Sequence, residues 1–175
     1  MAAKTFLRLV GGKLKQIVAT VVSSGVGDAG NVVALDDSGR LDQSLMPVGI
    51  GANTQQIPAS EALTAGNFVN FHTTAGALNV RKADNSNGRR ADGFVLSAVA
   101  NAAQATVYPM DSSNTALTGL TPGADYYLGT GGAAIAVPLD ETLPANQGGT
   151  KISQLLGTAK SATELITNDY DPVIL

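Results

Sequence analysis

The sequence contains no cysteine and no tryptophan, and its 175 residues include a single histidine, His72. Without cysteine the chain can form no disulfide, no thiolate metal site and no cysteine nucleophile. A lone histidine does not meet the needs of the common zinc sites, so we interpret His72 as a turn residue at a hairpin end. No signal-peptide core and no run near the ~20 apolar residues of a membrane helix is present. We expect synthesis and folding in a cytosol and no membrane partner.

Charged and aromatic residues are also scarce. Charged residues make up 14% of the chain and aromatic residues 5%, whereas hydrophobic residues reach 44% and glycine occurs 20 times. Ordinary globular domains are about one quarter charged. Small apolar residues with frequent turn signals favour a β-rich chain, and the low charge indicates that much of its surface is covered in an assembly.

The few charges are unevenly distributed. Residues 1–27 hold four bases and no acid, whereas residues 28–175 hold seven bases and fourteen acids, for a total of −3. The overall sign argues against binding of nucleic acid. The asymmetry predicts a basic N-terminal arm that docks on an acidic neighbour, such as another copy of the chain. The alternative is a solvated arm whose lysines have no partner.

The arm has the pattern of a β-hairpin. Residues 5–10 and 13–22 are rich in β-favouring side chains, and Gly11-Gly12 between them can supply the two positive φ angles of a tight turn. Some apolar residues of the second segment are also spaced as on a helix face. The density of β-branched residues favours the strand.

Two motifs after the hairpin resemble parts of ligand sites, but each lacks a feature that such a site requires. Residues 25–30 read G-x-G-x-x-G, but a dinucleotide site needs a helix to follow, and residues 31–35 are predicted to be a short strand. Asp36, Asp37 and Asp42 lack the spacing of a calcium loop, so a turn is expected over 36–39. We predict no cofactor and no metal.

Residues 51–175 show short apolar segments every 8–12 residues, separated by turn residues. This spacing is typical of an all-β sandwich or barrel. We therefore predict an all-β fold: an extended or hairpin arm with a joint over residues 1–50, then a compact antiparallel β-sandwich or β-barrel over residues 51–175. The predicted strands of the body are 67–71, 78–81, 94–99, 103–108, 126–129, 134–137, 152–159 and 164–167.

Catalytic patterns are not legible in the body. The acidic pairs Asp140-Glu141 and Asp169 with Asp171 lie in polar loops near prolines, where ordinary solvated carboxylates are expected. No G-x-S-x-G motif accompanies His72. The basic pairs at 81–82 and 89–90 lack the interleaved aromatic residues of single-strand binders. The sequence predicts a protein that is not an enzyme.

Several motifs resemble segments of tailed-bacteriophage virion proteins. The first series lies in the joint and reads D-A-G at 28–30, V-V-A-L-D at 32–36, S-G-R-L-D at 38–42 and S-L-M-P at 44–47. A second series, similar to another recurrent phage module, reads L-T-P-G-A-D-Y-Y-L-G at 120–129, Q-L-L-G-T-A at 154–159 and T-E-L-I at 163–166. Among such proteins the small size most resembles a capsid cement, or decoration, protein.

This resemblance implies a structural virion protein on the capsid surface that clamps neighbouring subunits of the major capsid protein. It also implies self-association, with a trimer favoured over a dimer. A small head-fibre or tail accessory protein that binds the host surface is the alternative. The residues we expect to dock on the capsid or on other copies are Lys4, Phe6, Arg8, Lys13, Lys15, Arg40, Leu45 and Met46.

Overall fold

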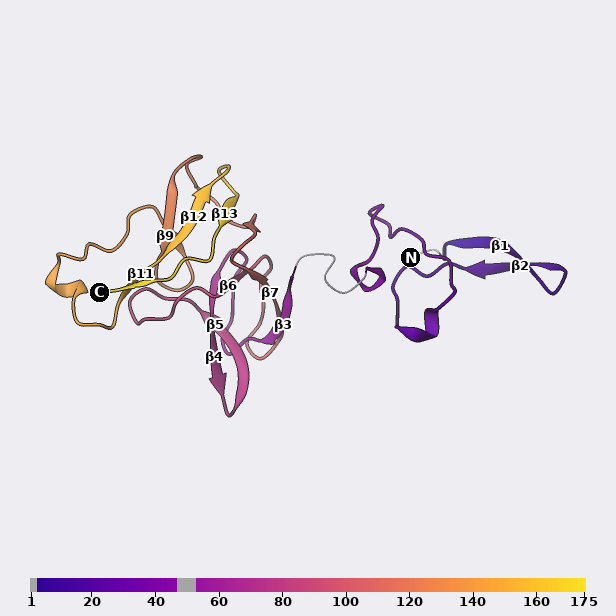
Figure 1. Ribbon diagram of the computed structural model, residues 1–175, viewed down its shortest axis with the longest axis horizontal. Helices are drawn as coiled ribbons and strands as arrows, with labels where there is room; N and C mark the ends of the chain where they lie inside the picture. The colour runs from indigo at the N-terminus through magenta and orange to yellow at the C-terminus, as the bar shows by residue number, and fades with distance from the viewer. Residues whose placement is uncertain (1–2, 47–52) are drawn as a thin grey trace. The chain divides into compact units, whose positions relative to one another are not determined.

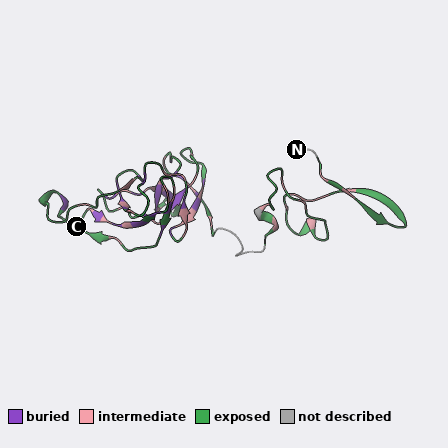
Figure 2. Ribbon diagram, turned by 90° about the horizontal axis from the view of Figure 1, so that it is seen from above, coloured by how far each residue is buried: buried purple, intermediate pink, exposed green. Residues whose placement is uncertain are grey.

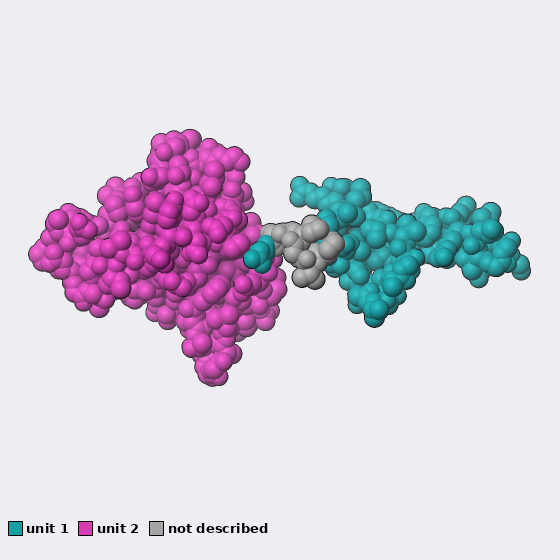
Figure 3. All heavy atoms as spheres, viewed as in Figure 1, with its two compact units in different colours: residues 1–53 teal, residues 54–175 magenta. Residues whose placement is uncertain are grey.

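A computed structural model of the chain describes residues 3–46 and 53–175. The chain divides into two compact units, Met1–Asn53, here unit 1, and Thr54–Leu175, here the body (Figure 3). The boundary predicted between residues 50 and 51 lies outside the described residues. In the described part of the chain, the regular elements are strands and three short 3-10 turns (Figure 1). The all-β prediction is confirmed.

Unit 1 begins with the predicted hairpin. Strand β1 (Thr5–Val10) pairs in antiparallel register with β2 (Lys13–Val18). Gly11 and Gly12 have φ angles of 59° and 75°, as a two-residue turn with both central residues at positive φ requires. Strand β2 ends at Val18, four residues before the predicted end at residue 22.

The remainder of unit 1 is loop. It contains the 3-10 turns η1 (Val26–Asp28) and η2 (Gln43–Leu45). The strand predicted over residues 31–35 is wrong, because only a single parallel bridge forms there, between Thr20 and Val33. Thr20 accepts from the Ala34 amide at 3.0 Å and donates to the Val32 carbonyl at 2.9 Å. The chain then turns away at Asp36, which prevents a longer ladder.

The body is built from two five-stranded antiparallel sheets. The first has the order β3-β7-β6-β4-β5 and the second β10-β9-β12-β13-β8. The strands of the first sheet are β3 (Gln55–Pro58), β4 (Phe68–Thr74), β5 (Ala77–Lys82), β6 (Gly93–Val95) and β7 (Gln104–Pro109). Those of the second are β8 (Ser113–Asn114), β9 (Asp125–Leu128), β10 (Ala134–Ile135), β12 (Leu155–Ala159) and β13 (Leu165–Thr167). A separate pair joins β11 (Ile152–Ser153) to β14 (Val173–Ile174), and η3 (Pro144–Asn146) precedes β11.

The first sheet curls until its two edges meet. Directly after β3, Ala59 forms a parallel bridge with Val80 of β5, and the Ser60 amide donates to the Val80 carbonyl at 2.8 Å. The residues inside the curl form one apolar cluster that includes Ile57, Val69, Val95 and Val107. The first sheet is thus a small, nearly closed barrel.

Alternation along the strands of this sheet supplies a second core. Phe68 and Phe94 directly precede Val69 and Val95, so they point to the opposite face. There they join the main cluster, whose members from the second sheet are Tyr126, Leu128, Leu156, Ala159 and Leu165. The two phenylalanine rings meet edge-on at 6.0 Å. The body therefore combines the two predicted alternatives: a curled barrel-like sheet, with a second sheet packed on one of its faces.

Some of the strand predictions for the body are wrong. Residues 152–159 form two strands in different sheets, β11 and β12, because Gln154 between them turns its amide into the interior. Edge strand β3 lies at residues 55–58, where no strand was predicted. His72 lies within β4 and not in a turn. The two-residue strands β8 and β14 carry no recognisable alternation and are absent from the prediction.

Candidate functional site

Unit 1 lacks an interior of its own. Among the residues of unit 1 whose exposure the structure describes, none is buried (Figure 2). Every buried apolar residue of the described chain belongs to the body, between Ile57 and Leu165. A two-stranded hairpin without a packed face is only marginally stable in water. Unit 1 therefore presents the larger unsatisfied apolar surface, and we take it as the candidate docking site.

The hairpin register separates its side chains into two faces. Partners across the strands share a face, and successive residues alternate between faces. The register pairs Leu9 with Leu14 and Arg8 with Lys15. The side that we call the apolar face comprises Thr5, Leu7, Leu9, Leu14, Gln16 and Val18. The side that we call the basic face comprises Phe6, Arg8, Val10, Lys13, Lys15 and Ile17.

The apolar face is the part of the site that the sequence prediction missed. Leu7, Leu9 and Leu14 are 69%, 66% and 71% exposed. The docking residues predicted from the sequence include Phe6, which is half-buried, but none of these three leucines. The register of the hairpin could have revealed this face. A two-residue turn at Gly11-Gly12 requires Leu9 to lie opposite Leu14, and this pairing assigns every other residue of the strands to one of the two faces.

The predicted basic residues take different positions. Arg8, Lys13 and Lys15 are exposed on the basic face, and no carboxylate of the described residues lies within ion-pair distance of them. Lys4 instead binds within unit 1. Its Nζ donates to the Leu35 carbonyl and lies 3.4 Å from Asp37 Oδ1. Three of the four cations of residues 1–27 thus lie on one surface, and the fourth, Lys4, ties the base of the hairpin to a loop.

The other three predicted docking residues lie in the loops of unit 1. Arg40 is exposed, and its backbone closes a turn with Asp36: the Asp36 amide donates to the Arg40 carbonyl at 2.8 Å. Leu45 is half-buried in η2, and Met46 beside it is 37% exposed. None of the three belongs to either hairpin face. Their assignment to docking stays a prediction.

Because none of the described residues of unit 1 is buried, hydrogen bonds to carboxylates hold its loops. Asp36 Oδ1 accepts from the Ser38 hydroxyl at 2.7 Å, the Ser38 amide at 2.8 Å and the Arg40 amide at 2.9 Å. The turn predicted over 36–39 is confirmed. Asp42 Oδ1 accepts in the same way from the Ser44 hydroxyl at 2.6 Å and amide at 2.9 Å. These hydrogen bonds favour the ionised form, so they lower the pKa of both aspartates, with the serine hydroxyl bond the largest cause.

The G-x-G-x-x-G segment is built on the same plan. Asp28 Oδ2 accepts from the Ser24 amide at 2.7 Å and the Ser24 hydroxyl at 2.9 Å. These bonds, the amide first, lower the pKa of Asp28. Only the three-residue turn η1 forms within the motif, and loop follows it. The motif thus positions an internal carboxylate at the turn where a dinucleotide site would need free amides at a helix N-terminus.

Acidic residues of the body also accept hydrogen bonds from nearby hydroxyl groups. Asp84 Oδ1 accepts from the Ser86 hydroxyl at 2.6 Å, and Asp140 Oδ1 accepts from the Thr142 hydroxyl at 2.7 Å. Asp140 was one of the acids considered for catalysis, and its carboxylate is a turn acceptor here. In the described residues, no group of three or more His, Asp or Glu side chains could hold a metal ion.

The one histidine has a partner that the sequence did not indicate. His72 Nε2 lies 2.7 Å from Ser60 Oγ, and Nδ1 lies 3.5 Å from the Thr74 hydroxyl. Ser60 Oγ also donates to the Val80 carbonyl at 3.2 Å. Since a hydroxyl has one hydrogen, Ser60 can donate either to the Val80 carbonyl or to His72 Nε2, depending on the tautomer of the imidazole. In either tautomer the bond joins β4 to the segment after β3, where the barrel closes.

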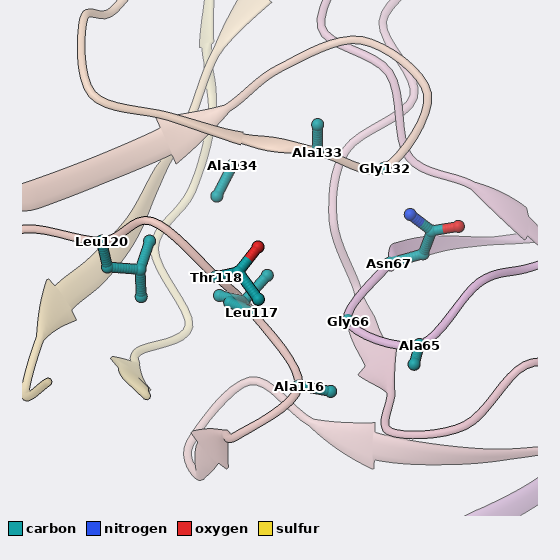
Figure 4. Close-up of a pocket in the computed structure, with 10 residues that line it drawn as sticks. All are labelled: Ala65, Gly66, Asn67, Ala116, Leu117, Thr118, Leu120, Gly132, Ala133 and Ala134. Atoms are coloured by element: carbon teal, nitrogen blue, oxygen red, sulfur yellow. The ribbon is translucent and has the colours of Figure 1, made fainter. Parts of the chain in front are cut away.

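A hollow of about 250 Å³ lies on the body where three segments of the chain, 65–67, 116–120 and 132–134, come together (Figure 4). Its size is below the usual range for ligand pockets. Two of its glycines permit close approach of the chain: a Cβ on Gly66 would lie 2.6 Å from the Ala116 carbonyl oxygen, and one on Gly132 would lie 2.8 Å from that of Phe68. The lining is mostly small, comprising Ala65, Gly66, Asn67, Ala116, Leu117, Thr118, Leu120, Gly132, Ala133 and Ala134.

The phage-like motifs of the body mark structural positions. Tyr126 Oη accepts from the Thr121 amide at 2.9 Å. Gln154 bonds both backbone groups of Ala91, and a Cβ on Gly157 would lie 1.9 Å from a backbone oxygen. These residues of the motifs therefore stabilise the fold of the body.

Comparison with known proteins gives one structural likeness. No family model matches the sequence, and no curated protein matches it. The structure of the N base of the head fibre protein gp8.5 of bacteriophage phi29 aligns at a TM-score of 0.44 and 12% identity, covering 67% of this chain and 95% of that one. A likeness at this level establishes neither a shared fold nor a shared function. No helix in the described residues is long and apolar enough to cross a membrane.

Proposed function

We propose that this chain is a structural protein of a tailed-bacteriophage virion, attached through unit 1, with the body displayed outward. The proposal rests on the difference in burial between the two units. Unit 1 exposes all of its described apolar side chains at least in part, whereas the body packs two cores of its own. The motif series at 28–47 and 120–166, which resembles phage virion proteins, supplies the class of particle.

Attachment without catalysis agrees with how the chain uses its acids. Asp28, Asp36, Asp42 and Asp140 each accept hydrogen bonds from nearby serine or threonine groups. A clamp or anchor needs apolar burial, backbone pairing and charge complementarity, and no tuned acid or base. We propose the major capsid protein as the acidic neighbour that meets the basic face, and other copies of this chain as further partners.

Two forms of this function are open to the same structure. As a capsid cement protein, the chain would clamp neighbouring capsid subunits in many copies. As a small head fibre or tail accessory, a few copies would be anchored by unit 1, and the body would meet the host surface. A body with complete cores needs no neighbour for its own folding, and this favours the head-fibre form at least as much as the cement form.

Copy number on purified virions tests the proposal. A stained gel calibrated against the major capsid protein should show the chain in every particle preparation. Hundreds of copies per particle would select the cement form, and a handful would select the fibre or accessory form. Absence of the chain from purified virions, while it is abundant in the infected cell, would overturn the function in both forms.

A further inference from the structure

The apolar face of the hairpin carries no charged residue. It presents Leu7, Leu9 and Leu14, each about two-thirds exposed or more, and Val18 at 59%. Its two polar members bond each other, since Gln16 Nε2 donates to Thr5 Oγ1 at 2.8 Å. A surface that carries no charge, and whose two polar side chains share a hydrogen bond, loses little polar hydration when it is covered.

All the cations of the hairpin strands lie on the opposite side. Arg8, Lys13 and Lys15 belong to the basic face, with Arg8 directly across from Lys15. An acidic partner would therefore be attracted to the basic face, where the charge is. The apolar face offers such a partner no complementary charge, so it requires an occupant that is itself apolar and uncharged.

We propose that the apolar face of β1–β2 docks against the same face of a second copy of this chain. The inference rests on the proposed attachment role of unit 1 and deepens it by assigning a different partner to each face. Two apolar faces can meet without burying any charge, and the cations of both copies then point outward. Contact through the basic faces would instead place six cations together. The chain thus matches itself on one face only.

The absence of cysteine makes this contact directly testable. In the full chain, Leu7→Cys and Leu9→Cys each place one thiol on the apolar face, and Arg8→Cys and Val10→Cys are matched controls on the neighbouring positions of the basic face. A short bis-maleimide linker should give covalent dimers from the apolar-face variants and few from the controls. Equal yields from both faces, or none from either apolar-face position, would overturn the proposal.

Sedimentation of the full chain supplies the second measurement. Leu9→Thr with Leu14→Thr keeps strand propensity while removing apolar surface, so the hairpin persists. We expect self-association to weaken at least about tenfold. The triple variant Arg8→Gln, Lys13→Gln, Lys15→Gln should keep the wild-type association. A wild-type chain that is monomeric at every concentration would overturn the proposal.

Binding to virions separates this inference from the proposed function. If the threonine variant remains associated but no longer binds virions, the apolar face belongs to a virion partner, and the self-docking proposal is overturned while the function stands. If the wild-type chain self-associates through this face but is absent from virions, the attachment role fails and the contact survives.

Discussion

Arg8 lies directly opposite Lys15 in the β1–β2 hairpin, on the same face as Lys13. Like charges placed opposite each other destabilise a strand pair, and no carboxylate of the described residues is paired with these three. A hairpin that tolerates this arrangement gains stability when an acidic surface covers it. The basic face therefore makes its own prediction about attachment.

Replacing Arg8, Lys13 and Lys15 by Gln should weaken binding to virions that lack this protein. The loss should be largest at low ionic strength, because salt screens surface charges over about 10 Å at 0.1 M. Co-sedimentation with virions across a salt series measures it. Lys160→Gln, which removes an exposed cation of the body, is the control and should have less effect. Equal binding by the triple variant at every salt concentration would show that the basic face is only solvated.

Unit 1 should loosen in acid before the interior of the body opens. The pKa values of Asp28, Asp36 and Asp42 lie below the ordinary 3.8 because serine and backbone groups donate to the ionised carboxylates. A lowered folded-state pKa gives stability that is present above 3.8 and is lost as the pH falls through the lowered value. The protection factors of the Ser24, Ser38 and Ser44 amides, that is, the exchange rates of an unfolded chain at the same pH divided by the observed rates, should therefore decrease below about pH 3.8.

A variant separates this titration from general acid unfolding. Asp36→Ala removes the acceptor for Ser38 and Arg40, so exchange at Ser38 should be fast already at neutral pH. The buried strand residues Phe68 and Leu165 should keep their protection in the same variant, since they belong to the body. Unchanged protection of Ser38 in Asp36→Ala would show that the carboxylate does not hold the turn.

Gly157→Ala should destabilise the body severely. Gly157 has a φ of 150°, and a Cβ there would lie 1.9 Å from the Ile166 carbonyl oxygen in the neighbouring strand β13. Separation of β12 from β13 is the available relief, so we expect a loss of about 3 kcal/mol or more in the free energy of unfolding. Gly119→Ala is the control: φ is 73° and no atom lies within 4 Å. It should cost about 1 kcal/mol. Chemical denaturation measures both, and equal losses would contradict the steric account.

Gln154→Leu tests the polar link between the sheets. This side chain is 1% exposed; its Oε1 accepts from the Ala91 amide at 2.7 Å, and its Nε2 donates to the carbonyls of Ala91 and Tyr170, each at 3.0 Å. The leucine leaves these backbone groups unpaired, at about 1–3 kcal/mol for a buried group. Gln147→Leu is the control: it removes an exposed hydrogen bond from the side-chain amide to the Glu141 carbonyl and should change the free energy of unfolding by about 0.5 kcal/mol or less. Similar losses in the two variants would refute the burial argument.

Local sequence patterns determined much of the fold. Gly11-Gly12 between β-favouring segments predicted the hairpin and its turn, and Asp36 with Ser38 and Gly39 predicted a side-chain-bonded turn. These features depend on residues that are neighbours in the chain, so their causes are visible in the sequence. The all-β class followed in the same way from short apolar segments between turn residues. The strands β8 and β14 were not predicted, because two residues are too few to show the alternation of apolar and polar side chains.

The tertiary structure alone decided which surfaces the chain offers. Closure of the first sheet depends on Ala59 meeting Val80 across 21 positions, and no local signal encodes that encounter. The same holds for the contacts of Lys4 with the Leu35 carbonyl and with Asp37, which join residues far apart in the sequence. Composition alone showed that the N-terminal segment is basic and apolar. Only the register showed that the two properties lie on opposite faces, because alternation assigns a side chain to a face only after its partner across the hairpin is known.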